Sequence, residues 1–174
     1  MNKRKSFQIL FAFLTCIVLV ACSAEKLAFN DKKSARGIQK KYSTVIGVGE
    51  KEINNVRLYF FLDEWVGVPY RYAGKNKKGV DCSGFSGILQ KEVFGKTATG
   101  SSASIHNQCE KINRDELREG DLIFFKIESK EVSHMGVYLQ NNKFAHAVIK
   151  RGVAINDLNE PYYKKYFWGF GRLP

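Results

Sequence analysis

Apolar side chains recur three and four positions apart in the stretch after Asp81, at Phe85, Ile88, Leu89 and Val93. This spacing is typical of one buried face of a helix. Gly95 follows as a stop signal for that helix. A second buried helix is predicted for residues 56–66, where apolar and aromatic positions follow a similar pattern until Gly67 and Pro69 end it.

From about residue 122 the chain changes to short apolar segments separated by turns, which predicts β-strands. The predicted strands comprise residues 122–127, 132–140, 143–149 and 153–156, with a closing strand in the aromatic tail at 162–173. Asn141-Asn142 is a tight-turn sequence between the second and third of these strands. Helices first and antiparallel strands after them indicate an α+β fold, with the helices packed on one side of the sheet.

The N-terminal segment has the composition of a targeting sequence. Basic residues from Lys3 to Lys5 precede an apolar run from Ile9 to Val20, which is too short to span a membrane comfortably. The run ends in Leu19-Val20-Ala21-Cys22, which resembles a bacterial lipobox, so we expect a signal peptide at residues 1–21 and a lipid on Cys22. The alternatives are an ordinary secretory signal with a chance cysteine, or a single anchor helix.

The remaining chain divides into a short connection and one domain. Residues 22–52 are polar and basic, and we expect them to form a lipidated tether that is in part helical. Residues 53–174 then form one domain. A chain of 174 residues that is 44% hydrophobic and contains 3 prolines is long and apolar enough for such a core.

The net charge limits the classes of partner. The formal charge is +11, and loss of the three basic residues of the signal peptide lowers it to +8. In an exported protein this charge fits anionic wall polymers or lipid headgroups, although basic residues also serve solubility alone. Export, and a sequence without zinc-finger, RNP-like or helix-turn-helix signatures, exclude nucleic acid as the partner.

Two of the four cysteines remain in the predicted domain. Cys16 lies in the signal peptide and Cys22 would carry the lipid, which leaves Cys82 and Cys109. We expect Cys82 in the first turn of its helix, where free backbone N–H groups and the helix dipole favour a thiolate nucleophile. A buried structural cysteine is the alternative. A disulfide would consume the nucleophile, so both thiols are predicted to be free.

Two histidines on neighbouring predicted strands could serve this thiol. His134 and His146 are near cross-strand partners if Asn141-Asn142 forms the turn. His134 would then take the thiol proton, and His146 would fix its tautomer. Structural histidines and a zinc site are the alternatives, but the spacing does not match common zinc ligand sets, and we predict no metal and no cofactor. His106 is expected at the loop surface or the rim of the substrate site.

Several short motifs occur in a fixed order along residues 56–174. They are Gly67-Val68-Pro69-Tyr70-Arg71-Tyr72-Ala73-Gly74, Asp81-Cys82-Ser83-Gly84-Phe85, Gln108, Gly120-Asp121-Leu122-Ile123-Phe124-Phe125, His134-Met135-Gly136-Val137-Tyr138 and His146-Ala147. Together they resemble the NlpC-type cell-wall peptidases, a branch of the papain-like cysteine peptidases. The resemblance implies a papain-like fold, in which the nucleophile starts a helix that packs on an antiparallel sheet or half-barrel.

The resemblance also implies roles for individual residues. It implies Cys82 as nucleophile, His134 as base and His146 as the third, orienting residue. It further implies oxyanion or substrate contacts by Tyr70, Asp81 and Ser83. The sequence departs from the usual pattern at Ala73, where a glycine is usual, and in the loop at residues 100–108, which lacks an arginine.

The implied reaction is hydrolysis of an amide in the stem peptide of peptidoglycan through a thioester at Cys82. The bond is either the D-glutamyl–diamino acid bond or the D,D cross-link. The alternatives are a catalytically silent wall-binding lipoprotein and a papain-like amidase or acyltransferase for another substrate. We expect a monomer in the cell envelope that is anchored to the membrane through Cys22 and faces the periplasm or wall.

Overall fold

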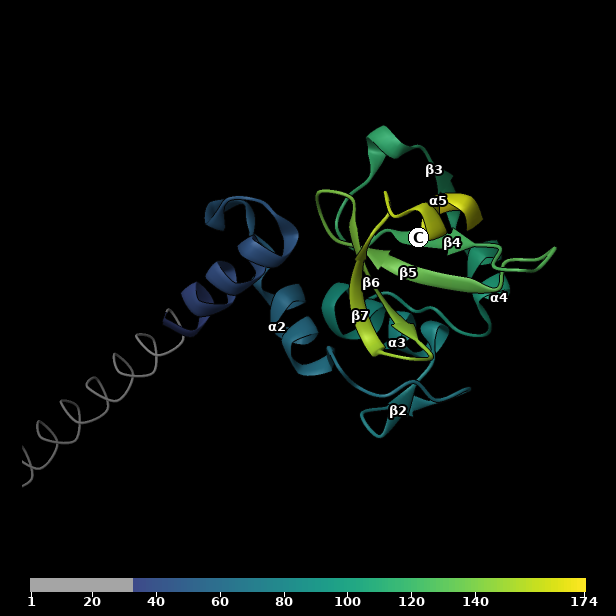
Figure 1. The fold of residues 1–174 in the computed structure, drawn as a ribbon, viewed down its shortest axis with the longest axis horizontal. Helices are drawn as coiled ribbons and strands as arrows, with labels where there is room; N and C mark the ends of the chain where they lie inside the picture. The colour runs from purple at the N-terminus through teal and green to yellow at the C-terminus, as the bar shows by residue number, and fades with distance from the viewer. Residues whose placement is uncertain (1–32) are drawn as a thin grey trace, which may run out of the picture.

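The computed structural model describes residues 33–174, in which an antiparallel sheet carries helices on both faces (Figure 1). The predicted signal peptide, Cys22 and the first part of the predicted tether lie outside the described residues. Within the part that is described, no helix is long and apolar enough to cross a bilayer.

Most helices precede the strands of the main sheet in the chain. The helical elements are residues 33–46, the 3-10 turns η1 (Glu50–Glu52) and η3 (Arg114–Glu116), the α-helices α2 (Val56–Trp65), α3 (Cys82–Leu89), α4 (Ser102–Gln108) and α5 (Pro161–Tyr166), and the π-helical turn η2 (Gln90–Phe94). The strands are β1 (Lys75–Asn76), β2 (Gly79–Val80), β3 (Glu110–Ile112), β4 (Leu122–Phe125), β5 (His134–Tyr138), β6 (Lys143–Val148), β7 (Gly152–Asp157) and β8 (Phe167–Arg172). Strands β1 and β2 pair with each other, and the other strands form one sheet in the order β3-β8-β4-β5-β6-β7 with every neighbouring pair antiparallel. This confirms the predicted α+β class.

Strand β4 is buried on both faces of the sheet. Leu122 and Phe124 point into the larger hydrophobic core beneath α2 and α3, while Ile123 and Phe125 point into a smaller core on the opposite face. Tyr163 of α5 closes that smaller core. The sequence analysis placed the helices on one face of the sheet and the closing strand within the tail at residues 162–173, and it predicted no helix there. The difference arises because a proline in the first helical turn lets α5 form before β8.

The helix at residues 33–46 packs into the domain. Ile38, Tyr42 and Ile46 recur four positions apart and are buried in the larger core. From residue 33 on, the structure therefore differs from the tether predicted for residues 22–52. The physical reason is this apolar stripe, which is only stable when it is covered.

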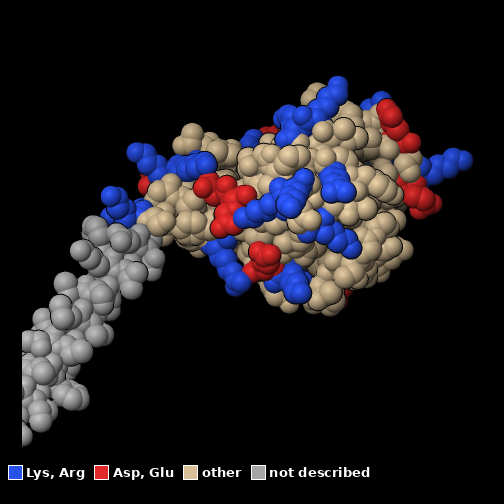
Figure 2. Space-filling view, turned by 90° about the horizontal axis from the view of Figure 1, so that it is seen from below, with Lys and Arg blue, Asp and Glu red and all other residues tan. Residues whose placement is uncertain are grey.

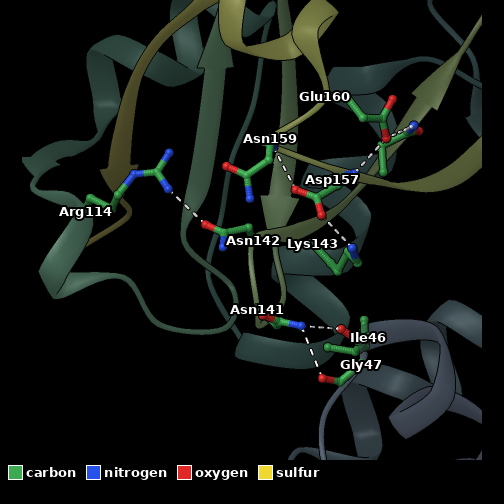
Figure 3. A network of polar contacts seen from close by, with 10 residues as sticks. Ile46, Gly47, Arg114, Asn141, Asn142, Lys143, Asp157, Asn159 and Glu160 are labelled. Atoms are coloured by element: carbon green, nitrogen blue, oxygen red, sulfur yellow. Dashed lines mark hydrogen bonds and ion pairs between the residues drawn. The ribbon is translucent and has the colours of Figure 1, made fainter.

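The β5–β6 hairpin is tied to that helix at its tip. Asn141 and Asn142 both adopt the left-handed backbone conformation, with φ of 49° and 59°, which confirms the predicted tight turn because asparagine tolerates this region. The Asn141 side-chain amide donates to the carbonyls of Ile46 (2.9 Å) and Gly47 (3.2 Å), at the C-terminal end of the helix (Figure 3). The Arg114 guanidinium donates to Asn142 Oδ1 at 2.9 Å. The tip of the hairpin is therefore held in place from two sides.

Candidate active site

Cys82 is the first residue of α3, and the side chain before it explains why the helix begins there. Asp81 is the N-cap, and its Oδ1 accepts hydrogen bonds from the Gly84 N–H (2.7 Å) and the Ser83 hydroxyl (3.0 Å). Its Oδ2 accepts from the Ala73 N–H at 2.9 Å. Asp81 thus joins the helix start to the preceding loop, and the Ser83 side chain is engaged with the same carboxylate.

Gly84 lets this helix start lie directly on the loop. A Cβ at Gly84 would lie 2.4 Å from the carbonyl oxygen of Gly74, which is closer than two such atoms can approach. A larger residue would therefore push the first turn of α3 away from the loop. The glycine two positions after the cysteine holds the thiol where it is.

The Cys82 thiol is largely withdrawn from solvent. Burial raises the pKa of Cys82 to about 11, and the Asp81 carboxylate adds to the rise, whereas hydrogen bonds with the backbone of Met135, Ser83 and Cys82 itself act to lower it. Burial thus outweighs the helix-start stabilisation expected from the sequence. The resting sulfur is a protonated thiol, and it needs a base to become a nucleophile.

Two histidine rings meet beside the thiol on the sheet. His134 begins β5 and His146 lies in β6, and the register that pairs Val137 with Ala145 makes the two histidines diagonal neighbours. His134 Nε2 lies 2.7 Å from His146 Nδ1. Gly136 lets β5 and β6 pack closely here, since a Cβ there would lie 2.7 Å from Phe144 Cδ2 and 2.9 Å from the Ala145 carbonyl oxygen. The predicted cross-strand neighbourhood is therefore present, with an offset of two residues.

Apolar rings surround the two imidazoles and favour their neutral form. The His146 ring centroid lies 4.5 Å from that of Phe144 and 5.3 Å from that of Tyr163, and His134 lies against Phe125. Burial, with a smaller contribution from the neighbouring His146 imidazole, lowers the pKa of His134 to about 3. Burial also lowers the pKa of His146 to about 4, although the hydrogen bond that its Nε2 makes to the accepting Asn156 Oδ1 acts to raise it. Both rings are neutral near pH 7.

Two cavities meet at the thiol. The first, of about 430 Å³, is lined by the nucleophile helix start, β5, the β6–β7 turn and α5, through residues that include Tyr70, Cys82, Ser133, His134, Lys150, Arg151 and Tyr162. The second, of about 470 Å³, is lined by residues that include Tyr70, Tyr72, Asp81, Cys82, Ser83, Ser102 and Ser133. Cys82 and Tyr70 border both cavities, whereas His134 borders the first. A substrate chain that spans both cavities would pass the thiol.

The structure brings most of the predicted site residues to this place. Tyr70 lies close to the thiol: burial is the main cause that raises the pKa of Tyr70, and Cys82 is the next largest.

Cys109 is a free thiol, as is Cys82, and it donates to the Ile105 carbonyl at 3.2 Å. The His106 ring packs edge-on against Phe124 with centroids 4.8 Å apart and lines neither cavity. Between residues 33 and 174 no cluster of three His, Cys, Asp or Glu side chains is arranged to hold a metal ion.

The sequence analysis missed the polar partners behind His146. Its Nε2 lies 3.0 Å from Asn156 Oδ1 and 3.3 Å from the Tyr163 hydroxyl. Arg151 and Glu160 in turn bond to the Asn156 side chain. The one available signal was Asn156 itself, a buried amide at the end of an apolar strand, since such a group requires partners.

Comparison with known proteins gives a consistent picture. The model of the NlpC/P60 family matches residues 67–172. The murein DD-endopeptidase MepS/murein LD-carboxypeptidase of Escherichia coli (strain K12) is 34% identical over 164 residues, which cover 90% of this chain and 86% of the relative.

Two solved structures share the fold. An NlpC/P60 family protein from Bacillus cereus ATCC 10987 superposes with a TM-score of 0.57 at 32% identity, covering 63% of this chain and 37% of that chain. RipD from Mycobacterium tuberculosis, described as a non-catalytic NlpC/P60 domain protein adapted to peptidoglycan binding, has a TM-score of 0.54 at 18% identity, with 67% and 95% covered. At that identity the second likeness concerns the fold alone.

Proposed function

Because this chain belongs to the NlpC/P60 family, we propose that it is a cysteine peptidase of the cell wall that hydrolyses amide bonds in peptidoglycan stem peptides. One observation carries the proposal: Cys82 and His134 border the same cavity, and the His134 ring is hydrogen-bonded to His146 behind it. The name of the E. coli relative, a murein DD-endopeptidase that matches most of both chains, supports the substrate class.

In the first step His134 takes the proton of Cys82 as the sulfur attacks the amide carbonyl carbon. His134 Nε2 is bonded to His146, so Nδ1 is the ring nitrogen that accepts this proton. The carbonyl oxygen becomes an oxyanion as the C–S bond forms. The backbone N–H of Cys82 at the helix start and the hydroxyl of Tyr70 are the candidate donors for it.

In the second step the C–N bond breaks and His134 gives its proton to the leaving amine. A thioester on Cys82 remains, and water attacks it while His134 again acts as base, which releases the acid and restores the thiol. The amine leaves from the side of the histidine, and His134 borders the first cavity. The amine half of the substrate therefore occupies the first cavity, and the acyl half occupies the second.

The location belongs to the same proposal. We place the domain in the cell envelope, with residues 1–21 as signal peptide and a lipid on Cys22 as membrane anchor. Lys and Arg side chains are spread over the domain surface in Figure 2, with fewer acidic side chains between them. A basic surface suits a monomer that works beside anionic wall polymers and lipid headgroups.

Digestion of purified wall fragments tests the function. The full chain is incubated with cross-linked and uncross-linked muropeptides, and products are identified by mass spectrometry, with Cys82→Ala as control. Cleavage at the D,D cross-link converts dimers to monomers, whereas cleavage after the D-glutamyl residue shortens the stems of both. If the wild type releases no peptide while its thiol is intact, the proposed function is wrong.

A silent wall-binding role is the second candidate, because RipD has this fold and is described as non-catalytic. The thiol separates the two roles. In a peptidase, alkylation of Cys82 by a small thiol reagent near pH 7 depends on His134 and slows in His134→Ala. In a binding protein the two alkylation rates are equal, and wall fragments are retained but not cut.

A further inference from the structure

The hydrogen-bond chain of the site continues beyond His146. Asn156 lies near the end of β7, and its side chain is buried on the face of the sheet that carries His146. Its Oδ1 lies 3.0 Å from His146 Nε2. A neutral imidazole has one N–H and one lone pair, so the partner at one nitrogen decides which nitrogen carries the proton.

Two charged residues fix which way the Asn156 amide points. The Arg151 guanidinium, which can only donate, bonds to Asn156 Oδ1 at 2.9 Å. The Glu160 carboxylate, which accepts, receives the Asn156 Nδ2–H at 2.8 Å. Glu160 Oε1 is itself held by the Asp157 N–H at 3.0 Å. Rotation of the amide by 180° would break both contacts, so the oxygen faces His146.

The orientation of the amide determines the protons of both rings. Asn156 Oδ1 accepts, so His146 carries its proton on Nε2 and presents a lone pair at Nδ1. His134 Nε2 lies 2.7 Å from that lone pair, so His134 also carries its proton on Nε2. The lone pair of His134 is then on Nδ1, and no hydrogen bond among residues 33–174 occupies that atom.

A competing donor makes this selection necessary. The Tyr163 hydroxyl lies 3.3 Å from His146 Nε2. If Tyr163 donated there, His146 would carry its proton on Nδ1 and donate it to His134 Nε2. His134 would then carry its proton on Nδ1 and could not accept one from the thiol.

We propose that Asn156 is a positioning residue that holds His146 and His134 in the tautomers required for His134 Nδ1 to accept the Cys82 proton, with Arg151 and Glu160 orienting its amide. The inference rests on the proposed function for its consequence in catalysis. The tautomers themselves do not depend on which bond is cut.

Nitrogen NMR of the two imidazoles tests the proposal directly, since protonated and unprotonated ring nitrogens have widely separated shifts. In the ¹⁵N-His-labelled wild type we expect a protonated Nε2 and an unprotonated Nδ1 in both His134 and His146. In Asn156→Leu, Tyr163 becomes the donor, and His146 is expected to move its proton to Nδ1. A wild-type His146 protonated on Nδ1 overturns the proposal, whether or not the protein cuts wall fragments.

Kinetics on wall fragments add the consequence. For Asn156→Leu, kcat is expected to fall by about 10²- to 10⁴-fold with KM little changed, as for a general base held in the wrong tautomer. The added change Tyr163→Phe removes the competing donor and should restore part of the loss. Asn159→Leu, which alters an exposed amide in the turn that follows β7, is the matched control and should keep wild-type kcat.

A polarity swap keeps the test decisive if Asn156→Leu fails to fold. In Asn156→Asp with Glu160→Gln, the carboxylate still accepts from His146 and Arg151, and the glutamine amide donates to the carboxylate. The bond from the Asp157 N–H to Glu160 Oε1 is the one contact that this swap loses. We expect wild-type tautomers and a kcat within about 10-fold of the wild type. If this variant is folded and has wild-type tautomers but is as slow as Asn156→Leu, Asn156 does not act through the tautomers and the proposal fails. A wild type that has these tautomers but releases no wall peptide refutes the proposed function instead.

Discussion

The sheet contains two buried polar networks, and they differ in how they end. Just before β4, Asp121 accepts hydrogen bonds from Arg172 Nε at Oδ1 (2.8 Å), and from Arg172 Nη2 (2.8 Å) and the Arg118 N–H (2.7 Å) at Oδ2. This network closes on itself as a two-pronged ion pair. The network of His134, His146 and Asn156 holds no ion pair between its rings and ends at an imidazole nitrogen beside a cavity.

The difference separates stabilisation from reactivity. In a closed network each buried charge is paired, which offsets the free energy of desolvation, and no group is left available for chemistry. A network that ends in a lone pair keeps one atom unsatisfied until a proton arrives. Changes in the first network should therefore affect folding, and changes in the second should affect the reaction.

The largest expected effect is on the reaction. Cys82→Ala should lower kcat/KM on wall fragments by on the order of 10⁴-fold or more, because no other group in the site can form the thioester. The melting temperature should change little. Cys109→Ala is the matched control, since it removes the other free thiol at a distance from both cavities. Equal loss of activity in the two variants would contradict the assignment of the nucleophile.

The next effect is on folding. Asp121→Ala should lower the free energy of unfolding by about 3 kcal/mol, because it leaves the Arg172 guanidinium without its bidentate partner and the Arg118 N–H without an acceptor. The kcat of the folded fraction should not change. Urea denaturation followed by fluorescence measures the loss.

Another ion pair supplies the control for that measurement. Glu64→Ala removes the partner of Lys77, in a pair whose side chains are 66% and 54% exposed. It should change the free energy of unfolding by less than about 0.5 kcal/mol. If Asp121→Ala costs no more than Glu64→Ala, the closed network does not stabilise the fold.

Acid should destabilise the second network. Burial holds the pKa of His134 at about 3 and that of His146 at about 4, below the ordinary value near 6.5 that an unfolded chain has. As the pH falls from 6.5 towards 4, these two histidines bind protons in the unfolded state but stay neutral in the folded state. Stability is thus full above pH 6.5 and should decline below it by up to about 1.4 kcal/mol per pH unit for each histidine.

Urea midpoints between pH 7 and pH 5 check this slope, in a range where most carboxylates stay ionised. His146→Gln removes one of the two buried imidazoles and should reduce the slope. An identical slope in the wild type and in His146→Gln would show that the buried pair is not what the acid titrates.

Much of the fold and the core of the candidate site could be predicted from the sequence, because their signals are local. Periodicity located α3, and the Asn141-Asn142 turn placed the two histidines on neighbouring strands. The depth at which Cys82 is buried could not be predicted, because it depends on a loop and a sheet that come together only in the fold.

The partners of His146 were missed for the same reason. Asn156, Arg151 and Glu160 come from a strand, a turn and the start of α5, and no spacing rule relates them. The helix at residues 33–46 is different, since its four-residue apolar spacing was present in the sequence. The polar and basic composition of residues 22–52 led instead to the prediction of a tether.

The smallest effect concerns the loop that precedes the nucleophile helix α3. Ala73 has a φ of 56°, in the region that favours glycine, while its N–H holds Asp81. Ala73→Gly removes a steric cost of about 1 kcal/mol, and the added freedom of the unfolded chain returns part of it, so we expect a net gain of about 0.5 kcal/mol. For a chain of this size the melting temperature should rise by about 1–2 °C.

Ala103→Gly, within α4, is the matched control, and its free energy of unfolding should instead fall by about 1 kcal/mol. A melting temperature lowered as far as in Ala103→Gly would mean that the strained alanine contributes contacts that outweigh its backbone cost.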